Sequence, residues 1–381
     1  MESLEEFLRE RERKRLLRRL CPSEKRRPGI AVRGNREFVD FSSNDYLGLS
    51  SHPAIIAAAK DAMDRYGMGA GASRLMSGSL SIHHELEEEV ASFKGTQRAL
   101  VFNSGYHANI GVIPALFGRH DLIVADALSH ASQLDGALLS RAKLVRFRHN
   151  DPENLSALLK KYRGKFRKCL VMTESVFSMD GDLAPLRELL EICRRHRCFM
   201  MVDEAHAAGV FGSRGRGRVE AEGLTGEVDL VMGTFSKALG SFGAYIAASR
   251  VIVEFLVNSA RSFIYSTALP ASVTAANLAA LRLCLAGETQ GDELLRRSSE
   301  FREKLRKKGW AVRGESQIVP MMAGESSRAI ELSESLVEKG FLVLPVRPPT
   351  VPEGSARLRF SMTSAHTNSQ TERLLEAIGA P

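Results

Sequence analysis

Residues 198–209 read CFMMVDEAHAAG, an apolar run that ends abruptly at an acidic residue, Asp203. His206 follows three residues later, and Gly209 closes the stretch. A short apolar run of this kind predicts a buried strand. Ligands of an open parallel sheet bind beyond the carboxyl ends of its strands, so residues that terminate such runs are candidate functional groups. Taken alone, Asp203 is equally well explained as a helix cap or a salt-bridge partner.

Similar runs lie on both sides of this stretch and decide the fold class. They are ALVF (99–102), LIVA (122–125), LVRF (144–147), CLVM (169–172), DLVM (229–232) and AYIA (244–247). Segments of helical length separate most of them, at 105–118, 129–140, 152–162 and 185–196. The alternation predicts an α/β fold with a mostly parallel sheet covered by helices.

The pattern changes near both ends of the chain. Residues 1–20 predict an amphipathic helix, and residues 37–41 a short strand. After residue 250 we expect helices at 250–260, 270–286, 291–308, 326–339 and 367–378, with strands at 317–322, 341–345 and 356–361. We therefore expect an N-terminal helix and arm (1–44), a large α/β domain (45–285) and a smaller α+β domain (286–381).

Composition excludes several protein classes. The 381 residues are 44% hydrophobic and 26% charged, which is ordinary for a globular protein. No apolar run approaches the ~20 residues that span a bilayer, and the charged N-terminus does not resemble a secretory signal. The net charge of +8 is concentrated in two basic runs without a nucleic-acid-binding motif, so we expect no nucleic-acid partner.

Five cysteines, Cys21, Cys169, Cys193, Cys198 and Cys284, form an odd and scattered set. Cys193, His196 and Cys198 are close in sequence, but packed, reduced thiols explain them better than a metal site. These features together predict a cytoplasmic protein without a metal.

Two further stretches end apolar runs with candidate functional groups. In DLVMGTFSKALGSFGAY (229–245), Lys237 lies among hydroxyl and glycine residues, which suits Schiff-base chemistry beside a phosphate. In FNSGYHAN (102–109), Ser104 and Gly105 precede a helix whose free N–H groups could bind an anion. A structural loop lysine and an ordinary strand-to-helix turn remain alternatives for each stretch taken alone.

Rival catalytic motifs are absent. No GxxxxGK[ST] or GxSxG occurs, residues 67–72 lack the GxGxxG spacing, and His83-His84-Glu85 does not complete HExxH. Nucleotide hydrolases, Rossmann dehydrogenases, serine hydrolases and zincins are therefore disfavoured.

The spacing of Asp203 and Lys237 after a Gly-rich helix start resembles that of fold-type-I pyridoxal-phosphate enzymes. A longer series of motifs is similar to the α-oxoamine synthase family, in family order over nearly the whole chain. The series is FSSNDYLGLS (41–50), ADALSHAS (125–132), TESVFSMDGDLAPL (173–186), VDEAHAAGVFGSRGRG (202–217), TFSKALG (234–240), IYSTALP (264–270), RPPTVP (347–352) and ARLRFSMTSAH (356–366).

The resemblance implies a homodimeric transferase that uses pyridoxal 5'-phosphate. RPPTVP and the compact length are most similar to members that condense L-alanine with pimeloyl-CoA, or pimeloyl-acyl-carrier protein, in biotin biosynthesis. Alternatives are a glycine-using sibling, such as 2-amino-3-ketobutyrate CoA ligase, and a non-catalytic sensing module of the same fold. Residues 1–40 are too short to supply the DNA-binding domain that such a module requires.

The resemblance also implies roles for residues around the cofactor ring. Lys237 would bind the cofactor covalently and act as general base, and Asp203 would pair with the pyridinium nitrogen. His206, with Ser178 nearby, would donate to the phenolate oxygen. His130 would stack on the ring and also contact the substrate.

The remaining implied roles concern the phosphate and the substrates. Gly105, Tyr106 and Thr234 would bind the phosphate, and Thr267 would reach the phosphate of the neighbouring subunit. Arg357 would pair with the amino-acid carboxylate, assisted by Asn44. Thr350 and Arg18 would contact the acyl substrate, although Arg15 or Arg19 could replace Arg18. His83 also matches a family position, where we expect a structural role.

Overall fold

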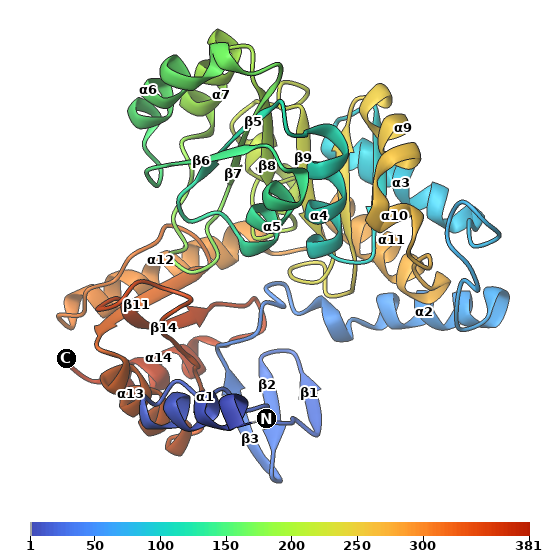
Figure 1. Cartoon of the computed structure of the whole chain (residues 1–381). Coiled ribbons are helices and arrows are strands. Elements are labelled where there is room, and N and C mark those ends of the chain that lie inside the picture. The colour runs from blue at the N-terminus through green and yellow to red at the C-terminus, as the bar shows by residue number, and fades with distance from the viewer. Residues whose placement is uncertain (1) are drawn as a thin grey trace. The chain divides into compact units, whose positions relative to one another are not determined.

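The computed structural model describes residues 2–381, which divide into two compact units (Figure 1). Unit 1 comprises residues up to 46, the short stretch 179–182 and residues 293–381. Unit 2 comprises residues 47–178 and 183–292. The expected N-terminal arm and C-terminal domain therefore share one unit.

Unit 2 is built on a seven-stranded sheet with the order β4-β10-β9-β8-β7-β5-β6. The strands are β4 (Arg98–Phe102), β5 (Leu122–Asp126), β6 (Lys143–Phe147), β7 (Cys169–Glu174), β8 (Phe199–Asp203), β9 (Leu230–Thr234) and β10 (Ala244–Ala248). Every apolar run from the sequence forms one of them. The pairs among β6, β5, β7, β8 and β9 are parallel, and β10 runs antiparallel to both β4 and β9.

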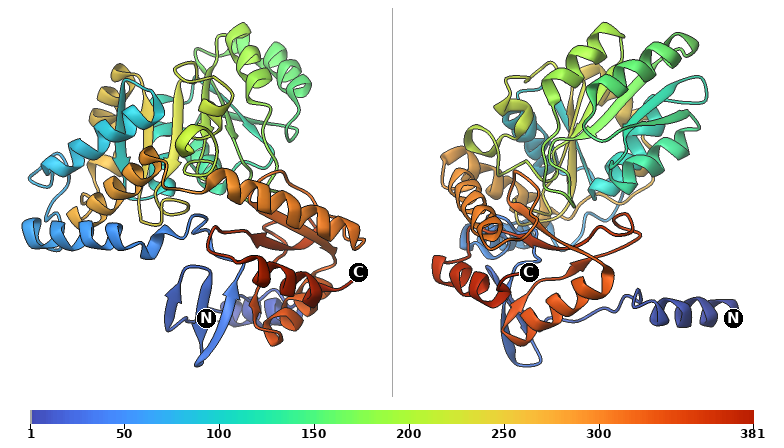
Figure 2. Two further views of the ribbon diagram at one scale, coloured as in Figure 1. Left: turned by 180° about the vertical axis from the view of Figure 1, so that it is seen from behind. Right: turned by 90° about the vertical axis from the view of Figure 1, so that its left-hand side faces the viewer.

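Helices lie on both sides of this sheet, as Figure 2 shows. The helices of unit 2 are α2 (Pro53–Tyr66), α3 (Ser81–Lys94), α4 (Gly105–Leu116), α5 (Ala131–Ser140), α6 (Pro152–Tyr162), α7 (Leu186–Arg195), α8 (Arg218–Ala221), α9 (Arg250–Ser259), α10 (Arg261–Ile264) and α11 (Ala271–Ala286). The main core packs apolar residues of α4, α9 and α10 against the sheet. Burial on both faces explains why the central strands are apolar without alternation.

Unit 1 contains two small sheets. In the first, β1 (Lys25–Arg27), β2 (Ile30–Arg33), β3 (Arg36–Asp40) and β12 (Phe341–Leu342) are neighbours in that order. In the second, the order is β11 (Ile318–Gly324), β14 (Ala356–Ser361) and β13 (Pro345–Val346). The helices are α1 (Glu2–Arg13), α12 (Gly291–Lys307, which begins in unit 2), α13 (Ser326–Glu338) and α14 (Asn368–Ile378).

The N-terminal helix is shorter than the sequence predicts. It ends at Arg13 instead of residue 20, and Met1 lies outside the described residues. Arg15 has a φ of 51°, a left-handed conformation that cannot continue an α-helix. The leucines at 16, 17 and 20 therefore belong to the segment after the helix. Strands β1 and β2 were not predicted, because KRR has no apolar residue and IAVR is only four residues long.

Two negative findings concern the described part of the chain. Over residues 2–381, no helix is both long and apolar enough to cross a lipid bilayer. In the same range, no three His, Cys, Asp or Glu side chains cluster in a way that would hold a metal ion.

Candidate active site

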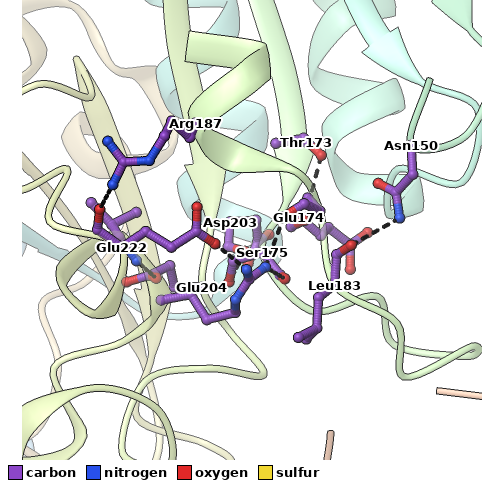
Figure 3. A network of polar contacts seen from close by, with 12 residues as sticks. Asn150, Thr173, Glu174, Ser175, Leu183, Arg187, Asp203, Glu204 and Glu222 are labelled. Atoms are coloured by element: carbon purple, nitrogen blue, oxygen red, sulfur yellow. Dashed lines mark hydrogen bonds and ion pairs between the residues drawn. The ribbon is translucent and has the colours of Figure 1, made fainter. Parts of the chain in front are cut away.

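The carboxyl ends of β7, β8 and β9 meet at one edge of the unit 2 sheet. Glu174, Asp203 and Thr234 are the last residues of these strands. Glu174 is the register partner of Asp203, and the N–H of Ser175 donates to the Asp203 carbonyl oxygen at 2.9 Å (Figure 3). Parallel pairing therefore places three polar side chains at the edge where ligands of such sheets bind.

A cavity of about 180 Å³ lies at this edge, lined by residues of unit 2 alone. It brings together seven of the residues that the sequence singled out: Gly105, Tyr106, His130, Asp203, His206, Thr234 and Lys237. The lining also includes Ser132, Glu174, Ala205, Met232 and Ser236. A larger hollow of about 800 Å³ lies beside α3 and α9, but none of these residues lines it.

Lys237 follows β9 in the turn TFSKALG, and its side chain is half-buried. Its Nζ lies 2.9 Å from His206 Nε2, so the two nitrogens are within hydrogen-bonding distance. The amine therefore points into the cavity beside a histidine that can exchange a proton with it.

Asp203 is a buried carboxylate with 5% of its surface exposed. Burial raises the pKa of its carboxyl, whereas Lys237 and the N–H of Ala205, which donates at 2.9 Å, lower the pKa. A carboxylate stays charged in such a place only when cations or donors face it. Asp203 is therefore suited to pair with a cationic ring nitrogen.

His130 caps the start of α5. Its Nδ1 accepts from the Ser132 N–H at 3.2 Å and lies 2.7 Å from Ser132 Oγ, which in turn accepts from Asn109 Nδ2 at 2.9 Å. A backbone N–H can only donate, so Nδ1 holds a lone pair and the ring proton is on Nε2. Burial also lowers the pKa of His130, which favours the neutral ring.

The start of α4 and the turn after β9 offer donors for an anion. Ser104 caps α4 by accepting from the His107 N–H at 3.2 Å, and Gly105 and Tyr106 begin the helix. The first N–H groups of a helix have no intrahelical partner and carry its positive dipole end. The Thr234 hydroxyl donates to the Gly243 carbonyl oxygen at 2.8 Å, and its oxygen lies 2.7 Å from Ser236 Oγ, so Ser236 is the donor of that pair at the same cavity.

These groups fit pyridoxal 5'-phosphate. The helix start and the hydroxyls suit its phosphate, the buried Asp203 carboxylate suits its ring nitrogen, and the Lys237 amine suits its aldehyde. The fit to the cofactor depends on the hydrogen-bonding and charged groups that surround this one cavity.

Two predicted residues of unit 2 lie outside this cavity lining. Ser178 follows β7 and is half-buried. Thr267 is exposed, and its carbonyl oxygen accepts from Asn103 Nδ2 at 3.0 Å. His83 is buried, with Nδ1 accepting from the Leu80 N–H at 3.0 Å and Nε2 2.8 Å from the Leu269 carbonyl oxygen. These contacts give His83 a structural position.

Apart from His130, which lines the cavity of unit 2, the predicted substrate-contacting residues belong to unit 1. Arg18 Nη2 donates to Thr350 Oγ1 at 3.1 Å, so these two residues, 332 positions apart in sequence, lie together. Arg357 is 1% exposed, and its Nη1 lies 2.6 Å from Asp180 Oδ1 in an ion pair. Asn44 Oδ1 instead accepts from Arg359 Nη1 at 3.2 Å.

Three residues with a place in these sites were not singled out by the sequence. Glu174 ends an apolar run in the same way as Asp203, so the same signal identifies it. Arg359 lies two positions from Arg357 in ARLRF, and strand alternation places both on one face. The hydrogen bonds between Ser132 and His130 form only in the folded chain, so no sequence pattern predicts them.

Comparison with known proteins assigns the class. A family model described as aminotransferase class I and II matches residues 36–378. The fold agrees: a serine palmitoyltransferase from Sphingomonas wittichii superposes with a TM-score of 0.94 at 34% identity, covering 99% of this chain and 96% of the other. The chain belongs to the aminotransferase class I and II family and has the fold-type-I architecture.

Curated relatives narrow the assignment. The 8-amino-7-oxononanoate synthase of Geobacter sulfurreducens is 50% identical over 350 residues, covering 91% of this chain and 89% of the relative. The 8-amino-7-oxononanoate synthase of Pelobacter propionicus is 51% identical over 337 residues, covering 87% of this chain and 85% of the relative. A solved structure of that name from Francisella tularensis has a TM-score of 0.77 at 33% identity, covering 90% of this chain and 96% of the other. Within the family, the chain groups with the 8-amino-7-oxononanoate synthases, which are pyridoxal-phosphate-dependent acyltransferases.

Proposed function

We propose that this protein condenses L-alanine with a pimeloyl thioester to give 8-amino-7-oxononanoate, CO2 and the free thiol. The observation that carries the proposal is the pairing of Lys237 with His206 at 2.9 Å, in one cavity with the buried Asp203. The chain is half identical to relatives that are named for this product. The acyl carrier is CoA or acyl-carrier protein.

The cofactor would be held by Lys237, Asp203, the start of α4 and Thr234. Bound pyridoxal phosphate supplies an electron sink that lets the amino-acid Cα lose a proton or a carboxyl group. Asp203 would maintain that sink by keeping a positive charge on the ring nitrogen. His130 lines the same cavity as a neutral side chain, so it would add no second positive charge beside the ring.

Lys237 is the group that moves the proton. Its Nζ takes the proton from the amino-acid Cα and returns one after the new carbon–carbon bond has formed. His206 Nε2 is close enough to orient Nζ and share its proton. Ser236 and Thr234 keep the turn in place, because the Ser236 N–H donates to Thr234 Oγ1 at 3.2 Å.

The amino-acid carboxylate is bound by an arginine of β14. The sequence favours Arg357, but the ion pair of Arg357 with Asp180 already neutralises that side chain. Arg359 is in contact with Asn44, the residue expected to assist, and also donates to Ser361 Oγ at 2.6 Å. We therefore assign carboxylate binding to Arg359 with Asn44, and a structural ion pair to Arg357.

Arg18 and Thr350 are assigned to the acyl thioester. Their mutual hydrogen bond joins the N-terminal segment to the loop before β14. Arg347 donates to the Arg15 carbonyl oxygen in the same place, and burial, together with the positive charge of Arg18, lowers the pKa of Arg347. Two guanidinium groups this close favour an anionic ligand, such as the carboxylate or phosphate groups of an acyl thioester.

A homodimer in the cytoplasm completes the proposal. Tyr265, Leu138 and Leu139 of unit 2 are 60–72% exposed, which is unusual for such large apolar side chains in a monomer. Thr267 is also exposed and lies two residues from Tyr265. A residue that binds the cofactor phosphate of the partner subunit has to lie on such an exposed surface. Five unpaired cysteines suit a reducing compartment.

Thiol release tests the function. Purified protein saturated with pyridoxal phosphate is given pimeloyl-CoA or pimeloyl-acyl-carrier protein, each with L-alanine, glycine or L-serine. We expect alanine-dependent release, with a loss of at least about 100-fold in Lys237→Ala because proton transfer is removed. Release with glycine alone assigns a sibling activity instead. Absence of release in all arms contradicts the proposal.

A further inference from the structure

Two carboxyl side chains lie next to each other in the cofactor cavity. Glu174 and Asp203 end the parallel neighbours β7 and β8 as register partners (Figure 3), and both line the cavity. Their exposed fractions are only 3% and 5%. Two buried carboxylates on adjacent strands repel each other strongly, so one of them is expected to keep a proton.

The surroundings of the two groups are unequal. Asp203 Oδ1 accepts from the Ala205 N–H, and Lys237, His130 and Asn109 also stabilise its charge. Glu174 Oε1, in contrast, has no hydrogen-bond partner although it is fully buried. A buried oxygen without a partner is costly unless a ligand satisfies it.

The charges around Glu174 favour its neutral form. Burial raises the pKa of Glu174 well above its ordinary value, and the charges of Asp203 and Asp126 raise it further. Lys237 and the N–H of His130 act in the opposite direction. Lys237 also faces Asp203, so its single charge is shared between the two carboxyls.

We propose that Glu174 is a neutral carboxylic acid that donates a hydrogen bond to an anionic oxygen of the ligand in this cavity, while Asp203 stays ionised beside it. The proposal rests on the proposed function, since that function places a cofactor and an amino acid here. The acceptor is either an oxygen of pyridoxal phosphate or the carboxylate of the amino acid. In both cases the donor stabilises negative charge without burying another full charge.

A set of isosteric variants separates charge from hydrogen bonding. Glu174→Gln keeps a neutral donor, Glu174→Ala removes it, and Asp203→Asn is the matched change at the neighbouring carboxyl. Retention of pyridoxal phosphate by each holoenzyme is measured by dialysis and absorbance, first without and then with L-alanine. A second readout is the carboxylic-acid carbonyl stretch in the infrared difference spectrum of wild type minus Glu174→Gln near neutral pH.

We expect Glu174→Gln to hold the cofactor within about 3-fold of wild type and Glu174→Ala to lose about 10-fold or more in affinity. Asp203→Asn, which removes a required charge, should lose at least as much as Glu174→Ala. The infrared band of a protonated acid should be present. A loss by Glu174→Ala without amino acid identifies the cofactor oxygen as acceptor, and a loss seen only with L-alanine identifies the substrate carboxylate.

Three results would overturn the proposal. Glu174→Gln could bind pyridoxal phosphate as weakly as Glu174→Ala does. Glu174→Ala could bind it as tightly as wild type, both without and with L-alanine. The infrared band of the protonated acid could be missing. The infrared comparison needs only wild type and the isosteric Gln variant, so it stands even where Glu174→Ala folds poorly. Thiol release by the wild type is measured separately, so a failure of the proposed reaction is distinguished from a failure at Glu174.

Discussion

The two arginines of β14 show how two equal side chains on one strand face acquire different functions. Arg357 is neutralised by Asp180, whereas Arg359 contacts the amide oxygen of Asn44 and the Ser361 hydroxyl. A lysine keeps the charge but cannot bind a carboxylate in the two-pronged way of a guanidinium. We expect Arg359→Lys to raise the KM for L-alanine about 10-fold or more, with little change in the KM for the thioester.

The control for this prediction is the matched change Arg357→Lys. It should lower stability through the altered ion pair while leaving the KM for L-alanine within about 3-fold of wild type. Initial rates at varied alanine concentration, with circular dichroism as a folding check, measure both variants. A raised KM in Arg357→Lys alone would return carboxylate binding to Arg357.

The sequence pattern predicted which residues line the cavity of unit 2, whereas it could not distinguish the two arginines of β14. Asp203 and Lys237 follow apolar strands directly, so the strand pattern places them at one sheet edge. Arg357 and Arg359 carry the same side chain on the same face, and only their partners distinguish them. Those partners, Asp180 and Asn44, are 177 and 315 residues away in sequence, a separation that no local pattern spans.

We expect His366, which joins the C-terminal part of unit 1 to β3, to make the stability of unit 1 sensitive to acid. His366, between β14 and α14, stacks on Phe41 after β3 with ring centroids 3.9 Å apart. Its Nε2 lies 3.1 Å from the Asp40 carbonyl oxygen, and its Nδ1 accepts from the Thr363 N–H at 3.2 Å. Burial lowers the pKa of His366 from 6.5 to about 4.

The sign of the effect follows from the lowered pKa. Below pH 6.5 the unfolded chain binds a proton at His366 that the folded chain does not, until the pH nears 4. We therefore expect the contribution of His366 to stability to be fully present above pH 6.5 and to decline between pH 6.5 and 4, by roughly 3 kcal/mol in total. Urea unfolding followed by fluorescence of Trp310, the single tryptophan and a residue of unit 1, measures the decline.

His366→Gln is the control for this acid response. The variant has no titrating group at 366, so its stability should change less than that of wild type between pH 7 and 4.5, although it starts lower. Equal pH dependence in both proteins would contradict the assignment of the acid response to His366.

Helices and strands could be predicted from the sequence where burial makes their residues distinctly apolar. Strands β5, β7, β9 and β10 of the large sheet are fully buried and largely apolar, because helices cover both faces. The exposed strand β1 reads KRR, and the end of α1 depends on the backbone conformation of Arg15, neither of which hydrophobic periodicity reports. Sequence patterns therefore revealed the elements around the core and missed those at the surface.

The whole molecule is expected to act as a dimer with shared sites. Thr267 is exposed and lies outside the cavity lining of its own chain, while Lys237 lies inside it. If Thr267 binds the cofactor phosphate of the partner subunit, each site combines Lys237 of one subunit with Thr267 of the other. A change at either position then inactivates a homodimer, and a mixed dimer can restore one site.

Co-expression of Lys237→Ala and Thr267→Glu chains, each with its own affinity tag, tests this arrangement. In the mixed dimer, one site receives both changes and the other receives neither. Random pairing makes half of the dimers mixed, so we expect about a quarter of wild-type thiol release from the unfractionated mixture. Dimers purified through both tags should give about half. The same release from mixed dimers as from the parental homodimers would place Thr267 and Lys237 in the same subunit's site.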